Sequence, residues 1–183
     1  MLDRVGTMEE SDWQKVQVLL DHGHALGYHG EHHLGAEASG LTPEAWVQQE
    51  VLPSMDAFAS RNLSAEVLAM PRGDSTAEHE AAVLEVVERV RLTAGPAHED
   101  VTPWASGCGE GPVHKAVSLD ERWGGVDRWL PEVLALREGA GFGVVHAYGH
   151  EVGGEGVDPD ALIELIDASQ TRGWSWVGYD ALP

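Results

Sequence analysis

Short apolar runs alternate with amphipathic stretches along the 183 residues, and this alternation constrains the fold more than any other feature of the sequence. Five apolar runs have the length and composition of buried strands: 25–29, 66–70, 91–94, 143–146 and 174–179. Between them, apolar residues recur at helical spacing. Strands that alternate with helices favour a largely parallel sheet or barrel. The sequence therefore predicts an α/β fold, built as one domain over residues 1–183.

The helices are expected to begin at residues whose side chains accept hydrogen bonds from the first helical turn. The expected helices cover residues 7–22, 42–58, 75–90, 126–137 and 158–173, with N-caps or capping boxes at Thr7, Thr42, Ser75 and Asp158. Pro53 lies inside the second helix and is expected to kink it. A Gly-rich loop is predicted over residues 95–123, with one short strand near 113–117.

The charge balance excludes some classes of partner. The chain has 31 Asp and Glu residues against 11 Lys and Arg, a formal net charge of −20. An acidic surface repels phosphate, so neither nucleic acid nor an anionic membrane is expected as a partner. The sequence shows no run of about 18 apolar residues and no apolar signal segment after Met1. We therefore expect a chain that is cytoplasmic as written, without a membrane span. Cys108 is the single cysteine, so no internal disulfide can form.

Histidines are concentrated near the start of the chain. Five of the ten histidines lie between positions 22 and 33, and His29 and His33 stand four residues apart. Neutral imidazole is the commonest protein ligand of zinc-like metals, and two imidazoles leave coordination positions open for water and substrate. Nearby glycines, among them Gly30, allow the sharp turns that a loop after a strand requires. The pair is a candidate metal site, while a polar loop with neighbouring histidines is the simpler alternative.

Three polar segments directly follow predicted strands. They cover residues 29–33, 71–74 and 146–150. In parallel α/β folds the functional site lies at the carboxyl ends of the strands, in the loops that follow them. The sequence therefore predicts that these segments contribute to a site.

Together these motifs resemble the polysaccharide deacetylase family. In that family a pair of histidines spaced as His29 and His33 binds the metal, and His24 would correspond to a structural residue at a helix end. The turn Met70-Pro71-Arg72-Gly73-Asp74 partly matches a groove-wall motif of the family, with Arg72 in place of a tyrosine. Val144-Val145-His146 is similar to the segment that carries the family's catalytic histidine. The resemblance implies a distorted or incomplete (β/α) barrel.

The resemblance also implies a function. The expected activity is metal-dependent hydrolysis of acetyl groups on an N- or O-acetylated carbohydrate, with a divalent metal, most simply zinc. His29 and His33 would bind the metal, and His146 would return a proton to the leaving group. Pro71, Arg72 and Tyr148 would contact the substrate.

The family's first motif, a strand ending in Asp-Asp, has no counterpart here. That motif supplies the catalytic base and a metal ligand, and only 28 residues precede His29. The chain is therefore expected to be truncated at its N-terminus relative to the family, and its hydrolase activity to be impaired. Asp74 could replace the missing ligand, or could simply stabilise its own turn.

A non-catalytic barrel that binds carbohydrate or metal is the alternative function. Aromatic side chains in or near loops could stack on sugar rings, and three tryptophans are candidates: Trp104, Trp123 and Trp129. The other four tryptophans are expected in the core: Trp13, Trp46, Trp174 and Trp176.

Overall fold

The computed structural model describes residues 5–93, 111–126 and 146–178. Contacts within the chain group it into two compact units, Met1–Leu92 with Val177–Pro183, and Thr93–Trp176. The two units are described in turn.

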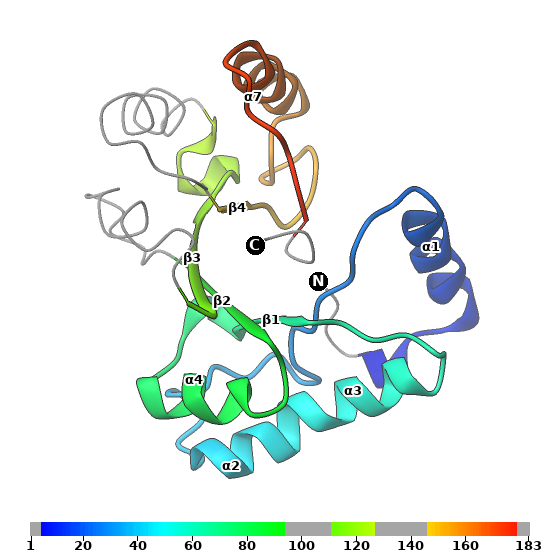
Figure 1. Cartoon of the computed structure of the whole chain (residues 1–183), viewed down its shortest axis with the longest axis vertical. Helices are drawn as coiled ribbons and strands as arrows, with labels where there is room; N and C mark the ends of the chain where they lie inside the picture. Colours follow the sequence, from blue (N-terminus) through cyan, green and yellow to red (C-terminus); the bar gives the residue numbers. More distant parts are fainter. Residues whose placement is uncertain (1–4, 94–110, 127–145, 179–183) are drawn as a thin grey trace. The chain divides into compact units, whose positions relative to one another are not determined.

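Unit 1 contains most of the described helices together with two strands. Its elements are η1 (Val5–Thr7), α1 (Glu10–Asp21), α2 (Pro43–Trp46), the π-helical η2 (Val47–Val51), α3 (Leu52–Ala59), β1 (Val67–Ala69), η3 (Pro71–Gly73), α4 (Ala77–Leu84) and β2 (Arg89–Thr93). Figure 1 shows η2 joining α2 to α3 as one long helical segment, with α4 beside α2.

The strands of unit 1 run parallel. β1 pairs with β2 in a register that places Leu68 opposite Val90. On the other side of β1, Tyr28 forms a parallel bridge with Leu68, and the Tyr28 amide donates to the carbonyl of Val67 over 2.9 Å. Tyr28, Leu68 and Val90 are all buried, as expected where helices cover parallel strands. The segment at Tyr28, β1 and β2 therefore run side by side in parallel, and their carboxyl ends lie at the same edge.

The segment from Pro43 to Ala59 remains helical through Pro53 because one turn changes its hydrogen bonding. Thr42 caps the start, where its side chain accepts from the Ala45 amide. Pro53 has no N–H and cannot donate to the carbonyl of Gln49, four residues earlier. A π-helical turn absorbs this defect, with the Leu52 amide donating to the Val47 carbonyl five residues back.

The core of unit 1 lies between these helices and the strands. Aromatic rings connect its parts: Phe58 on α3 lies 4.8 Å from Tyr28 and 6.1 Å from Trp13, measured between ring centroids. The largest fully buried hydrophobic side chains include Trp46, Phe58, Leu68, Met70, Val83 and Val90. Burial of side chains of this size contributes roughly 1.5–3 kcal/mol each relative to exposure.

Unit 2 is built on a second parallel strand pair. Its described elements are β3 (Val113–Ser118), η4 (Glu121–Trp123), β4 (Ala147–Tyr148) and α7 (Pro159–Thr171). Ser118 is paired with Tyr148. Asp158 caps α7 by accepting from the Ala161 amide over 2.8 Å. A hydrophobic cluster packs α7 near β3 and β4, formed by Leu119, Val126, Val157 and Leu165 with the partly buried Ala147, Ala161 and Leu162.

Much of the predicted α/β pattern is confirmed. Strands were expected at 66–70, 91–94 and 113–117, and β1, β2 and β3 cover them to within two residues. The N-caps at Thr42 and Asp158 are also confirmed. The deacetylase-type barrel is a finer statement than these parallel pairs and stays a prediction. The expected strand 143–146 and helix 126–137 lie largely outside the described residues.

Several local predictions are wrong. Thr7 ends η1 instead of capping α1, whose N-cap is Glu9. The helix expected over 75–90 is capped by Thr76 and stops at Leu84, because Val90 is needed opposite Leu68 in the sheet. The kink expected at Pro53 stays a prediction, and the helical hydrogen bonding changes to the π-type directly before this residue. In segment 25–29 only Tyr28 makes a bridge, and residues 174–178 form no strand.

Only two of the four tryptophans expected in the core are buried. Trp13 and Trp46 are buried as predicted, but Trp174 is half-buried and Trp176 is 49% exposed. The Trp176 indole N–H instead donates to the Ser169 hydroxyl on α7. Trp123, the last residue of η4, is exposed. Trp104 and Trp129 lie outside the described residues.

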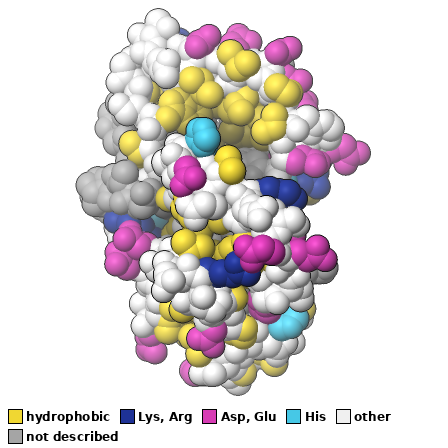
Figure 2. All heavy atoms as spheres, turned by 90° about the vertical axis from the view of Figure 1, so that its right-hand side faces the viewer, with side chains coloured by type: hydrophobic (Ala, Val, Ile, Leu, Met, Phe, Trp, Pro, Cys, Tyr) yellow, Lys and Arg dark blue, Asp and Glu magenta, His cyan; other side chains and the backbone are white. Residues whose placement is uncertain are grey.

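Acidic side chains are spread over the surface. Figure 2 shows Asp and Glu side chains dispersed over the face that it displays, with few Lys and Arg side chains between them. This agrees with the formal net charge of −20. Among the described helices, none is long and apolar enough to cross a membrane.

Candidate functional site

His29 lies at the carboxyl edge of the unit 1 strands, directly after the bridge at Tyr28. Its ring Nδ1 is 2.8 Å from the carbonyl oxygen of Ala69, the last residue of β1. A carbonyl only accepts, so Nδ1 carries the proton and Nε2 retains its lone pair. This hydrogen bond at Nδ1 fixes the tautomer in the form that a metal-binding imidazole needs, with the lone pair on Nε2.

The protonation state of His29 is set by its surroundings. Burial lowers the pKa of His29 to about 4, although the hydrogen bond to Ala69 partly opposes the shift. The positive charge of Arg91 on β2 lowers it further. The imidazole is therefore neutral at pH 7, and its Nε2 lone pair is available without loss of a proton.

His33 faces His29 from the same loop. The two ring centroids are 4.8 Å apart, and the ring planes meet at 77°. His33 has a backbone φ of +60°, in the left-handed region that non-glycine residues seldom adopt. This conformation costs about 1–2 kcal/mol, so the surrounding structure must stabilise it. The loop thus brings the two predicted ligands together.

The turn after β1 lies against this loop. Pro71 is buried, and its Cγ would lie 3.1 Å from a Cβ built on Gly30. Arg72 is exposed and also has a φ of +60°. Asp74 does not complete a three-residue metal site with the two histidines, and its Oδ2 accepts from the Ala38 amide over 2.9 Å. Substrate contacts by Pro71 and Arg72 stay predictions.

The donor set at His29 and His33 fits two positions of a zinc-like ion. A catalytic zinc commonly has three protein ligands. Within residues 5–93, 111–126 and 146–178, no group of three His, Cys, Asp or Glu side chains is placed to hold a metal. The pair alone is therefore the candidate metal site in the described part of the chain.

Unit 2 contains a second polar arrangement, between Asp120 and His150. Asp120 is completely buried, and its Oδ2 lies 2.5 Å from the Nδ1 of His150. The same carboxylate accepts from the His150 amide at 2.9 Å and from the Ser118 hydroxyl at 2.9 Å. The Arg122 guanidinium is 3.9 Å away. The His150 side chain is 49% exposed, so this imidazole is oriented by a buried carboxylate while it remains open to solvent.

Asp120 is held in its charged form by these donors. Burial alone would raise the pKa of Asp120, but the hydrogen bonds from the His150 backbone, the His150 ring and Ser118 lower it below its usual range. A buried carboxylate that fixes an imidazole tautomer is a common device for proton transfer.

His146, the predicted catalytic histidine, has a different environment. It is buried, and its ring centroid lies 4.7 Å from that of His114 on β3. Burial, with a smaller contribution from the positive charge of His114, lowers the pKa of His146 to about 4. Tyr148 lies close to His150, with ring centroids 5.5 Å apart. The catalytic role of His146 and the substrate contact of Tyr148 stay predictions.

His150 lies in the segment 146–150 that was expected to contribute to a site, but neither His150 nor Asp120 was given a role there. Asp120 comes two residues after β3, and His150 two residues after β4. Because β3 and β4 are parallel, their carboxyl ends share an edge. Applying the strand-end rule to the weak strand at 113–117 as well would have added Asp120 beside His150.

Comparisons with known proteins identify no relative. No family model matches the sequence, and neither a curated protein nor a solved structure is significantly similar to it. The function is therefore inferred from the residues themselves.

Proposed function

We propose that this chain belongs to a metal-dependent hydrolase that removes acetyl groups from an N- or O-acetylated carbohydrate. The observation that supports this proposal is the loop that turns His29 toward His33 while Ala69 fixes the His29 tautomer. A half-buried, neutral imidazole with its Nε2 lone pair unprotonated is a ligand ready for a divalent ion, most simply zinc.

His29 and His33 would hold the ion. When bound, it would supply Lewis-acid polarisation of the acyl carbonyl. The positive charge of Arg72, at the turn beside Gly30, is suited to contact a polar substrate. Proton transfer to the leaving amine or alcohol is the role proposed for His146. Within unit 2, His150 is exposed and is oriented by the Asp120 carboxylate.

A non-catalytic protein that binds metal or carbohydrate is the second candidate function. It is favoured by one observation: among the described residues, no carboxylate joins His29 and His33 to form a three-residue metal site. A hydrolase of this kind needs a base to take the proton of the attacking water, and the Asp-Asp motif that would supply it is absent from the sequence.

Metal titration followed by an acetate assay separates these functions. We would titrate the chain with Zn²⁺ and Co²⁺ by calorimetry, and then measure acetate release from acetylated chito-oligosaccharides and acetylated xylan. His29→Ala and His33→Ala are the test variants, and His24→Ala, in the exposed segment after α1, is the matched control.

The hydrolase proposal expects metal binding that both test variants abolish and the control retains, with slow, metal-dependent acetate release. Metal or oligosaccharide binding without acetate release would favour the binding protein. An affinity for Zn²⁺ that is equal in the wild type and both test variants would exclude His29 and His33 as the site.

A further inference from the structure

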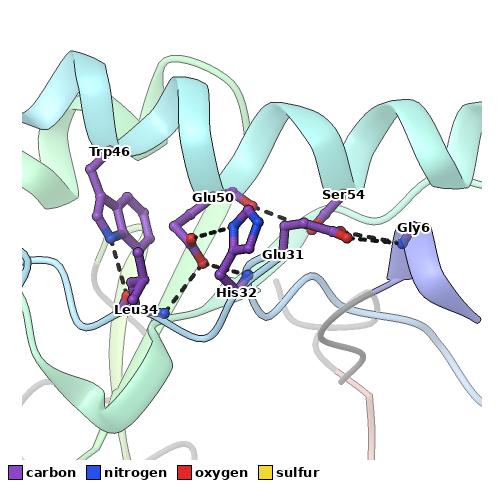
Figure 3. A network of polar contacts seen from close by, with 7 residues as sticks. All are labelled: Gly6, Glu31, His32, Leu34, Trp46, Glu50 and Ser54. Atoms are coloured by element: carbon purple, nitrogen blue, oxygen red, sulfur yellow. Dashed lines mark hydrogen bonds and ion pairs between the residues drawn. The ribbon is translucent and has the colours of Figure 1, made fainter.

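Glu50 is a fully buried carboxylate in the π-helical turn of unit 1. Its Oε2 accepts from the His32 amide at 2.9 Å and from the Leu34 amide at 3.3 Å. Its Oε1 is 2.9 Å from the Nδ1 of the His32 ring. Figure 3 shows these contacts converging on one carboxylate from the segment that follows Gly30. A buried carboxylate is costly unless several donors surround it, and here the donors come from a single loop.

The main chain of Glu50 binds the same loop. Its carbonyl accepts from the Glu31 amide at 3.0 Å and from the Ser54 hydroxyl at 3.3 Å. The indole of Trp46, one helical turn earlier, donates to the Leu34 carbonyl at 3.1 Å. Residues 31, 32 and 34 are thus attached to the helical segment on both sides of His33.

This attachment explains how His33 can keep its left-handed conformation. The amides of the residues before and after His33 both donate to Oε2 of Glu50. Strained backbone of this kind persists only when its surroundings over-determine it, and it is concentrated at functional sites. Gly30 permits the close approach, because a Cβ there would lie 2.7 Å from Oε2 of Glu50.

We propose that Glu50 is the positioning residue of the His29–His33 pair: it holds residues 31–34 so that the two imidazoles face each other as metal ligands. The inference rests on the proposed metal-binding function and adds to it a residue that contacts neither the metal nor the substrate. A purely structural role predicts lost stability alone, whereas a positioning role predicts a specific loss of metal affinity.

The test compares three variants of the full chain: Glu50→Ala, Glu50→Gln and Ser54→Ala. Zn²⁺ affinity is measured by calorimetry, the Co²⁺ complex by its visible absorption, and folding by urea denaturation. Nuclear Overhauser contacts between the His29 and His33 rings report the loop conformation without metal. Ser54→Ala is the matched control, because it removes a hydrogen bond to the Glu50 carbonyl and leaves the carboxylate in place.

We expect Glu50→Ala to weaken Zn²⁺ binding by about 10–100-fold, the usual effect of removing a group that orients metal ligands, and to abolish the ring contacts. Glu50→Gln should rescue most of the affinity. Its amide oxygen can accept from the His32 and Leu34 backbones, while its NH₂ can donate to the other tautomer of His32. Ser54→Ala should retain wild-type affinity.

Unchanged Zn²⁺ affinity and intact ring contacts in a folded Glu50→Ala variant would overturn the inference. If that variant does not fold, Glu50→Asp replaces it, because a carboxylate one methylene shorter cannot reach the loop and is expected to lose the same affinity. If the wild type binds no metal, the proposed function fails, and the ring contacts decide the positioning role by themselves: their loss in Glu50→Ala supports it and their survival overturns it.

Discussion

The Nδ1 atom of His150 lies 2.5 Å from Oδ2 of the buried Asp120, and the His150 amide donates to the other oxygen of the same carboxylate. Backbone and ring therefore fix His150 together. Ser118, at the end of β3, donates a further hydrogen bond from its hydroxyl to Oδ2. One carboxylate thus connects the segment after β4 to the end of β3.

Replacing Asp120 is expected to lower the free energy of unfolding of unit 2. The loss should grow with the number of hydrogen-bond donors that are left without an acceptor. Asp120→Ala leaves the His150 amide and the Ser118 hydroxyl without their carboxylate, and an unsatisfied buried donor costs about 1–3 kcal/mol. Asp120→Asn keeps one acceptor oxygen and should cost less. Urea denaturation at pH 7 measures both variants. Equal stability of Asp120→Ala and the wild type would show that these contacts contribute nothing.

The stability contributed by Asp120 should depend on pH at the acidic end. Its pKa in the folded chain lies below the usual value near 3.9. Its contribution is therefore fully present above about pH 4 and is lost as the pH falls through the folded-state pKa. Denaturation midpoints from pH 5 to pH 2.5 should fall more steeply in the wild type than in Asp120→Asn.

His146 should reduce stability in a different pH window. Its pKa is about 4 in the folded chain, against about 6.5 in the unfolded chain. Between these values the unfolded state binds more protons, so stability falls as the pH is lowered from about 6.5 to about 4, by at most ~1.4 kcal/mol per pH unit for one group. His146→Gln should reduce this slope. His29 contributes a slope of the same sign, so part of it remains. An unchanged slope in His146→Gln would show that His146 titrates alike in both states.

The candidate sites differ in how far local sequence could predict them. His29 and the turn at Pro71 follow apolar runs that are recognisable by composition, and the parallel pairing of Tyr28 with Leu68 and of Leu68 with Val90 brings them to one edge. The role of Glu50 could not be predicted this way. A glutamate inside an amphipathic helix indicates an exposed position, and Glu50 is buried on the side that faces the loop, in the π-turn next to Pro53.

Where local patterns were ambiguous, tertiary pairing decided the structure. The valines from Val83 to Val90 suit a helix or a strand, and the helix was expected to run through all of them. The structure ends α4 at Leu84 and assigns Val90 to β2, where it is buried opposite Leu68. Only the non-local partner distinguishes the two outcomes.

Gly30→Ala is expected to affect both the fold and the metal site. Gly30 has a φ of +78°, and Gly40 provides a matched control with a φ of +68° and no atom within 4 Å of a built Cβ. Both alanine variants carry the backbone penalty of about 1–2 kcal/mol. Gly30→Ala also forces a Cβ against Glu50 and Pro71, an overpacking that costs a further ~1–3 kcal/mol. Equal unfolding free energies for the two variants would show that a Cβ at position 30 does not clash with Glu50 and Pro71.

Chemical modification can test whether His150 is the accessible proton-transfer group of unit 2. Diethyl pyrocarbonate acylates the unprotonated nitrogen of a neutral imidazole. Asp120 fixes the His150 proton on Nδ1, which leaves Nε2 as the reactive atom, and the side chain is 49% exposed. His146 is only 5% exposed. Mass spectrometry of peptides taken during the reaction at pH 7 should therefore show acylation of His150 well before His146.

The variant Asp120→Asn separates orientation from exposure in this experiment. An asparagine side chain can present its NH₂ to the ring and so favour the tautomer with its proton on Nε2, which removes the reactive lone pair from the exposed side. We expect slower acylation of His150 in Asp120→Asn, with an unchanged rate at the exposed His24, which has no contact with Asp120 among the described hydrogen bonds. Equal rates at His150 in both proteins would show that exposure alone determines its reactivity, and the carboxylate would then have no activating role.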